Sequence, residues 1–249
     1  MGASVKTEAV ILRSLRYGEA DRILHLYSPE LGRIGAIAKG VRRAKSRFGG
    51  RLEPITRSAL LLHRGRGDLY TITGADTVDA YRRLREQHAS LDMAARACDA
   101  VARIFAEGDP HPAVFHLLCN ELALLDADPA HATHANQLAF RLKLLVAAGL
   151  APQLGACASC GEPDHLSAFS GAAGGVVCSA CEAGAFPLAE ETHRFMTGAL
   201  AVPLAETPGA TERALRQAER AIAETLEHHG GLRLRDAAPR QRVPASPRG

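Results

Sequence analysis

Four of the six cysteines stand in two closely spaced pairs, and this spacing is the strongest chemical signal in the sequence. Two residues separate Cys157 from Cys160 and Cys178 from Cys181, and seventeen residues lie between the pairs. Each short gap lets one tight turn present two thiolates to the same ion, and two such turns complete a tetrahedron of sulfurs. We therefore predict a zinc-ribbon-like site with Zn²⁺ in a structural role, because four thiolates leave no coordination position for water. Iron fits the same ligand set and stays open as an alternative.

The other cysteines and the first residues of the sequence bear on this prediction. Cys98 and Cys119 fall on the apolar faces of expected helices, where cysteine acts as a small buried hydrophobe. Residues 1–6 show no basic start followed by an apolar block, and no apolar run reaches eighteen residues. We expect a cytoplasmic protein, in which paired cysteines indicate metal more often than disulfides. His165 is a further candidate ligand.

A basic stretch near the N-terminus is the second signal. Residues 1–81 hold 14 Lys+Arg and 8 Asp+Glu, whereas the remainder holds 16 and 19. Thirteen residues, 39–51, carry six of these cations and no acid. Like charges at this density repel one another unless they face a counter-charge such as phosphate, although a solvated loop without a ligand stays open. The predicted DNA-binding residues are Lys39, Arg42, Arg43, Lys45, Arg47 and Arg51, with Phe48 as the best base-stacking platform.

Binding by such a loop would be governed by backbone charge, with little preference for sequence. Six contacts to single-stranded phosphates would give a slope of about −4 in a plot of log affinity against log salt. Arg13, Arg16, Arg33 and Arg57 are candidates to extend the basic surface, and each is equally readable as an ordinary exposed arginine.

The elements that position these residues predict an α+β fold. Short strands without crossover helices, at about 5–12, 22–27, 33–38, 55–63 and 69–73, suggest a small antiparallel barrel of the five-stranded OB-fold type. Apolar residues at helical spacing then predict helices over about 81–107, 113–126, 134–150, 189–201 and 211–229. We expect an OB-fold domain at 1–81, a helical domain at 82–235 with a zinc module at about 151–187, and a disordered tail at 236–249.

No enzyme signature is present in the sequence. We find no ATPase-type phosphate-binding loop, no nucleophile elbow and no His-Glu-x-x-His motif. The histidines show no ligand spacing, so we assign no catalytic residue and expect no enzymatic activity.

The sequence combines a barrel that carries a basic loop with a helical region and a late four-cysteine insert, which is an uncommon combination. The sequence resembles the RecO family of bacterial recombination mediators. The resemblance spans about residues 5–185. It is carried by GEADRILHLYSPELGRIGAIAKGVRR at 18–43, KSR at 45–47, LEP at 52–54, DL at 68–69, RLKLL at 141–145 and GLAP at 149–152. The four cysteines indicate the zinc-containing type of the family.

The resemblance implies a non-enzymatic role in DNA repair. Proteins of this family bind single- and double-stranded DNA, anneal complementary strands, and act with RecR to load RecA onto strands coated by SSB, whose C-terminal tail they contact. The resemblance thus implies a bacterial cytoplasmic protein, associated with the nucleoid during repair. Arg141 and Lys143 are conceivable rims of a site for that acidic tail, and a solvated helix face is an equal alternative. A zinc-ribbon adaptor of a transcription or other nucleic-acid complex, or a metal-dependent hydrolase, stays open from the residues alone.

Overall fold

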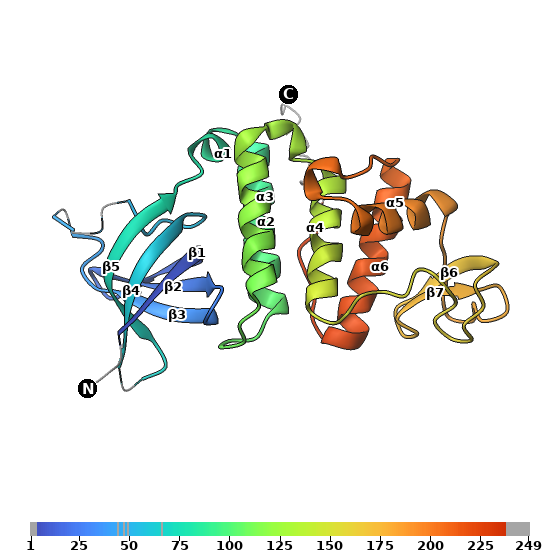
Figure 1. The fold of residues 1–249 in the computed structure, drawn as a ribbon, viewed down its shortest axis with the longest axis horizontal. Coiled ribbons are helices and arrows are strands. Elements are labelled where there is room, and N and C mark those ends of the chain that lie inside the picture. Colours follow the sequence, from blue (N-terminus) through green and yellow to red (C-terminus); the bar gives the residue numbers. More distant parts are fainter. Residues whose placement is uncertain (1–3, 44, 47, 49, 66, 238–249) are drawn as a thin grey trace, which may run out of the picture.

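The structure is a computed structural model that describes residues 4–43, 45, 46, 48, 50–65 and 67–237. Figure 1 shows three parts in a row: a β-barrel at one end, a group of helices in the middle and a small three-stranded sheet at the other end. The predicted α+β class is confirmed. Within the described residues, no helix combines the length and the apolar character that a membrane span requires.

The barrel is closed, with strand order β1-β2-β3-β5-β4. The predicted five-stranded OB-like barrel is therefore confirmed. One pair departs from the expected antiparallel arrangement, because β3 and β5 pair in parallel at Ala36–Tyr70 and Ile37–Thr71. The strands are β1 (Ser4–Tyr17), β2 (Asp21–Ser28), β3 (Gly32–Ala38), β4 (Arg57–Arg64) and β5 (Tyr70–Asp79).

Strand β1 is longer than its sequence pattern predicts because it serves two neighbours. Its first half pairs with β4 and its second half pairs with β2, and Val10 has a partner in each strand. The register shifts between Ile11 and Arg13, as a β-bulge requires. A bulge bends a strand and increases its twist, which allows one strand to pass from one side of a small barrel to the other.

The barrel has its own apolar core. Leu24 and Leu26 alternate into it from β2, and Ile34, Ala36 and Ala38 do so from β3. Residues from the segment between β3 and β4 complete this core, namely Phe48 and Leu52. Phe48 is only 2% exposed. Its ring is therefore covered by the barrel and offers no face to a base, so this part of the sequence prediction is corrected.

The helical region begins differently from the prediction. The expected helix over 81–107 is divided at Gln87, whose backbone is extended. The helices are α1 (Arg82–Glu86), α2 (His88–Ile104), α3 (Pro112–Ala127), α4 (His134–Ala147), α5 (Glu190–Ala201) and α6 (Glu212–Gly230), with short 3₁₀ helices η1 (Pro129–His131) and η2 (Leu204–Glu206). Cys98 and Cys119 are buried in the core of this region, as predicted.

Specific contacts fix the barrel against the helices. The ring of Tyr27 on β2 meets that of Phe105 edge to face, with centroids 6.1 Å apart. The Arg85 guanidinium donates hydrogen bonds to the carbonyl of Pro54 at 2.6 Å and to the Thr56 hydroxyl at 2.9 Å. Gly32 has φ +64, and a Cβ there would lie 2.2 Å from the Asp109 carbonyl oxygen. The two parts therefore share one packed junction.

The chain returns across the helices after α6. Ala237 is fully buried, and its backbone N–H donates to the Glu219 carboxylate on α6. The predicted tail at 236–249 thus overlaps the described structure at Asp236, which is exposed, and at Ala237, which is buried. Its remaining residues, 238–249, lie outside the described part of the chain.

A fully buried carboxyl group on α3 gives the fold a pH dependence. Burial raises the pKa of Glu121 to about 8, although the Asn136 amide donates to both carboxyl oxygens at 3.0 Å. Because the folded state holds this proton more tightly than the unfolded state, stability is retained below the unfolded pKa and lost as the pH rises towards 8. The loss is at most about 1.4 kcal/mol per pH unit.

We expect Glu121→Gln to flatten the dependence of the unfolding free energy on pH between about pH 5 and pH 8. Urea unfolding at several pH values measures this effect. Equal pH slopes for the variant and the wild type would show that Glu121 does not bind its proton preferentially in the folded state.

Candidate nucleic-acid interface and metal centre

The segment that follows β3 is held in place by hydrogen bonds with residues 19–21, where the chain turns from β1 into β2. The Asp21 carboxylate accepts a hydrogen bond from the Gly40 N–H at 2.7 Å. The Arg42 N–H donates to the Ala20 carbonyl at 2.9 Å, and the Arg42 guanidinium donates to the Glu19 carbonyl at 2.9 Å. This turn therefore braces the base of the basic loop, a role for Asp21 that the sequence analysis did not assign.

Four cations of the loop project from this braced base into solvent. Lys39, Arg42, Arg43 and Lys45 are all exposed. In the described part of the chain, no carboxylate oxygen lies within 4.0 Å of their charged nitrogens. The loop thus keeps its charge available, which is the electrostatic requirement for binding a polyanion.

The remaining predicted loop residues stand differently. Arg51 is exposed, and its carbonyl accepts a hydrogen bond from the Ser58 hydroxyl at 2.9 Å, which ties the end of the loop to β4. Arg47 lies outside the described residues. Phe48 lies in the barrel core, so the structure brings the predicted cations together but removes the predicted aromatic platform.

Tyr17 offers an exposed aromatic ring near the loop. It is 54% exposed and pairs with Asp21 at the end of the β1–β2 hairpin. No local pattern in the sequence singles out Tyr17, because its nearness to the loop depends on the hydrogen bond from the Gly40 N–H to Asp21.

The four arginines considered as extensions of the basic surface fall into three groups. Arg57 is bound by Glu8 at 2.5 Å and lies over the Phe115 ring at 5.6 Å, so it is occupied within the fold. Arg16 is exposed at the end of β1. Arg13 and Arg33 line a pocket between the barrel and α2.

The four predicted ligand cysteines meet at the far end of the molecule. Their sulfur atoms all lie within 4.8 Å of one another, and the Sγ atoms of Cys160 and Cys178 are 3.7 Å apart. A tetrahedral ion with Zn–S bonds of 2.3 Å separates its sulfurs by about 3.8 Å. The donor set and its spacing therefore fit one tetrahedral metal ion. His165 is not part of the metal-binding cluster found among the described residues.

Two tight turns create this arrangement. The Gly161 N–H donates to the Cys157 carbonyl at 2.9 Å, and the Cys181 N–H donates to the Cys178 carbonyl at 2.9 Å. Gly161 has φ +82, a backbone conformation that favours glycine. Each turn folds one cysteine pair so that both thiols point to the same place.

The surroundings shift the pKa values of two of the thiols in opposite directions. The backbone N–H of Cys178 is the main cause that lowers the pKa of Cys157 to about 6, so this ligand favours the thiolate. The neighbouring thiols of Cys160 and Cys178 raise the pKa of Cys181 to about 12. Four sulfurs this close do not all become thiolates without a cation between them, which is a further reason why the cluster fits a metal ion.

The module around the cluster packs partly on the helices. Its strands are β6 (Leu166–Ser170), β7 (Gly175–Cys178) and β8 (Phe186–Pro187), in the order β7-β6-β8. One face contributes Phe169, Val176 and Phe186 to the main helical core, and the Arg220 guanidinium of α6 lies 4.1 Å from the centre of the Phe186 ring. The other face has a core of only four buried residues, Cys157, Ala168, Val177 and Cys178. Two of these four core residues, Cys157 and Cys178, are therefore also predicted metal ligands.

Two family models match nearly the whole described chain. "Recombination protein O N terminal" matches residues 1–81, and "Recombination protein O C terminal" matches residues 88–237.

Curated relatives agree with these models. A protein of Rubrobacter xylanophilus named "DNA repair protein RecO" is 38% identical over 237 residues, which cover 92% of this chain and 94% of that protein. A protein of the same name from Anaeromyxobacter dehalogenans (strain 2CP-C) is 37% identical over 240 residues, which cover 92% of this chain and 93% of that protein. One from Myxococcus xanthus is 34% identical over 231 residues, with 92% and 93% covered. With its closed five-stranded barrel, its helices and its four-cysteine cluster, the chain belongs to the RecO family of DNA repair and recombination proteins.

Proposed function

We propose that this protein binds single- and double-stranded DNA through its basic loop and anneals complementary strands. The observation that carries the proposal is the set of four exposed cations without a carboxylate partner, Lys39, Arg42, Arg43 and Lys45, on a loop braced by Asp21. We include Arg47 and Arg51 among the proposed DNA-binding residues on the basis of the sequence.

The mechanism we infer is electrostatic. Contacts to phosphates release condensed counterions and supply affinity that does not depend on sequence. Partial neutralisation of two strands lowers their mutual repulsion while their base edges stay free to pair. Tyr17 takes the place of Phe48 as the proposed stacking contact, because it is exposed beside the turn that braces the loop. One aromatic ring is too few for extensive base readout.

The family role extends the proposal to partners. We propose that the protein acts with RecR, contacts the C-terminal tail of SSB, and thereby helps RecA to load onto coated single strands. Arg141 is excluded as a rim for the tail, because it is 3% exposed and donates to the Arg235 carbonyl at 2.5 Å. Lys143 borders an apolar cavity of about 300 Å³ that also includes Leu117 and Leu204. An acidic segment with an apolar end is the chemistry this cavity suits.

We further propose that the metal is Zn²⁺, that its role is structural and that the protein catalyses no covalent reaction. Four cysteine ligands close the coordination sphere and leave no place for substrate or water. Reduced thiols are also what a reducing compartment such as the cytoplasm maintains, which is the compartment we propose.

A strand-annealing assay tests the proposed function. The full-length protein should accelerate the pairing of complementary oligonucleotides, and the acceleration should decline steeply as monovalent salt rises. The same assay with SSB-coated strands examines the mediator role. Pairing at the uncatalysed rate in low salt would contradict the proposal and would favour a protein–protein adaptor.

A further inference from the structure

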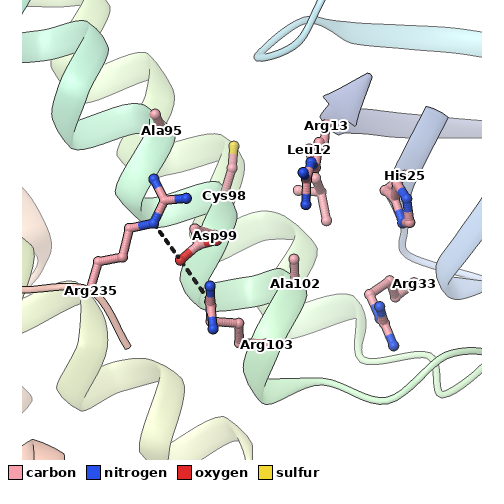
Figure 2. Close-up of a pocket in the computed structure, with 10 residues that line it drawn as sticks. All are labelled: Leu12, Arg13, His25, Arg33, Ala95, Cys98, Asp99, Ala102, Arg103 and Arg235. Atoms are coloured by element: carbon pink, nitrogen blue, oxygen red, sulfur yellow. Dashed lines mark hydrogen bonds and ion pairs between the residues drawn. The ribbon is translucent and has the colours of Figure 1, made fainter. Parts of the chain in front are cut away.

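A pocket of about 390 Å³ lies between the barrel and α2, away from both the basic loop and the metal centre. Its barrel wall carries Arg13, His25 and Arg33, and its helix wall carries Asp99 and Arg103. Figure 2 shows these side chains arranged around one space from its two walls, with Arg235 beside Asp99. The lining holds four arginines and one carboxylate.

Strand register explains why the barrel wall is cationic. Arg13 on β1 pairs directly with His25 on β2. Arg33 on β3 pairs with Tyr27, which is two residues from His25 and therefore points to the same face of the sheet. Arg13, His25 and Arg33 thus stand on the barrel face where Tyr27 packs on Phe105. Arg13 on β1 and Arg33 on β3 therefore place two positive charges on one wall of the pocket, with β2 between them.

The arginines of the two walls differ in how far they are neutralised. On α2, Asp99 binds Arg103 at 2.8 Å and Arg235 at 3.7 Å. Within the described residues, no carboxylate oxygen comes within 4.0 Å of a guanidinium nitrogen of Arg13 or Arg33. The Nε atom of Arg33 is also buried without a hydrogen-bond partner. The barrel wall therefore has unused donors as well as unbalanced charge.

The pKa of the His25 imidazole in this pocket is lowered. Burial is the main cause that lowers the pKa of His25, and the nearby charges of Arg13 and Arg33 lower it further, while Glu107 opposes them. The part of this shift that comes from Arg13 and Arg33 has the sign that would favour an anion at the same place.

We propose that this pocket binds a phosphate group through Arg13, Arg33 and Arg103. A planar carboxylate is satisfied by one guanidinium fork, whereas three guanidinium groups from β1, β3 and α2 suit a tetrahedral anion with more acceptor oxygens and more charge. The phosphate belongs either to a nucleic-acid strand or to a free phosphate compound. Arg13 lies four residues along β1 from Tyr17, about 13 Å, so a strand held at the basic loop extends along this face to the pocket. For a strand phosphate, the inference rests on the proposed DNA binding. For free phosphate, it stands independently.

The test uses the full-length protein and the double variant Arg13→Gln/Arg33→Gln. Titration calorimetry with inorganic phosphate, against chloride at equal ionic strength, should show binding to the wild type and at least tenfold weaker binding to the double variant. Arg194→Gln is the matched control, because Arg194 is 72% exposed on α5 and lies outside the pocket lining. The single variant Arg13→Gln, at an exposed position, should weaken binding in the same direction and covers the case in which the double variant folds poorly.

A second arm identifies the source of the phosphate. If the phosphate comes from a strand, the double variant should bind an oligonucleotide with a shallower salt dependence. The negative slope of log affinity against log salt should decrease in magnitude by about 1.4. An unchanged slope together with lost phosphate binding assigns the pocket to a free phosphate compound. Phosphate binding by a protein that ignores oligonucleotides would support the pocket and overturn the proposed function alone. Equal phosphate binding by the wild type and both pocket variants, or none by the wild type, would overturn the pocket.

Discussion

Replacing Lys39, Arg42, Arg43 and Lys45 by alanine should abolish strand annealing and flatten the salt dependence of single-strand binding. Each lost phosphate contact removes about 0.7 from the slope of log affinity against log salt, so four contacts remove about 2.8. Between 50 and 200 mM monovalent salt, wild-type affinity should therefore fall by about fiftyfold more than the affinity of the variant. Fluorescence anisotropy with a labelled oligonucleotide measures both slopes.

The fold should survive this change. The variant loses the hydrogen bond from the Arg42 guanidinium to the Glu19 carbonyl, but it keeps the bonds from the Gly40 N–H to Asp21 and from the residue 42 N–H to the Ala20 carbonyl, and the four side chains are exposed. A matched control removes the same charge elsewhere by replacing four exposed arginines on α1 and α6 by alanine, namely Arg82, Arg83, Arg213 and Arg216. A variant of the loop that anneals strands as well as this control does would exclude the loop as the DNA-binding element.

Removal of the metal should release the four-cysteine module while the barrel stays folded. Structural zinc contributes about 10–16 kcal/mol to isolated zinc-finger peptides, and the core on the cysteine side of this module has only four buried residues. Treatment with a chelator, or the variant Cys181→Ser, should reduce bound zinc from about one ion per chain to almost none. Limited proteolysis should then cut the chain between Cys157 and Gly184.

Cys98→Ala is the matched control for this experiment. Cys98 is buried in the helical core and lies outside the metal-binding cluster, so its replacement should leave both the zinc content and the protease resistance unchanged. A chelated protein whose module resists protease as well as the untreated protein does would show that packing of Phe169 and Phe186 on the helices is sufficient without metal.

The parts of this structure that the sequence predicts are those with local signals. Alternation in Arg22–Tyr27 and Arg33–Ala38 predicts two strands of the barrel, and two Cys-x₂-Cys pairs predict the metal cluster. Each signal lies within a few residues, because strand period and turn geometry are properties of short segments.

Long-range packing explains what the sequence did not predict. Phe48 has six cations near it in the sequence, which indicate an exposed residue. In the structure its side chain instead packs into the apolar core of the barrel. The first expected helix is divided at Gln87, and the short helix before the break is tied to the barrel by hydrogen bonds from Arg85 to the Pro54 carbonyl and the Thr56 hydroxyl.

The junction pocket also depends on distant pairing. Arg13 and Arg33 are twenty residues apart in sequence, and only the registers of β1, β2 and β3 bring them to the same face. A hydrophobicity pattern does not encode register between strands, so a cluster of this kind is found from the structure.

Binding of the wild-type protein to unrelated oligonucleotides across a range of salt concentrations tests the central claim most directly. We expect single strands of different sequence to bind with affinities within about threefold of one another, with a slope of log affinity against log salt between about −3 and −4. Failure to bind oligonucleotides in dilute buffer, or strong binding that is insensitive to salt, would contradict the proposal that the charged side chains of the basic loop bind DNA.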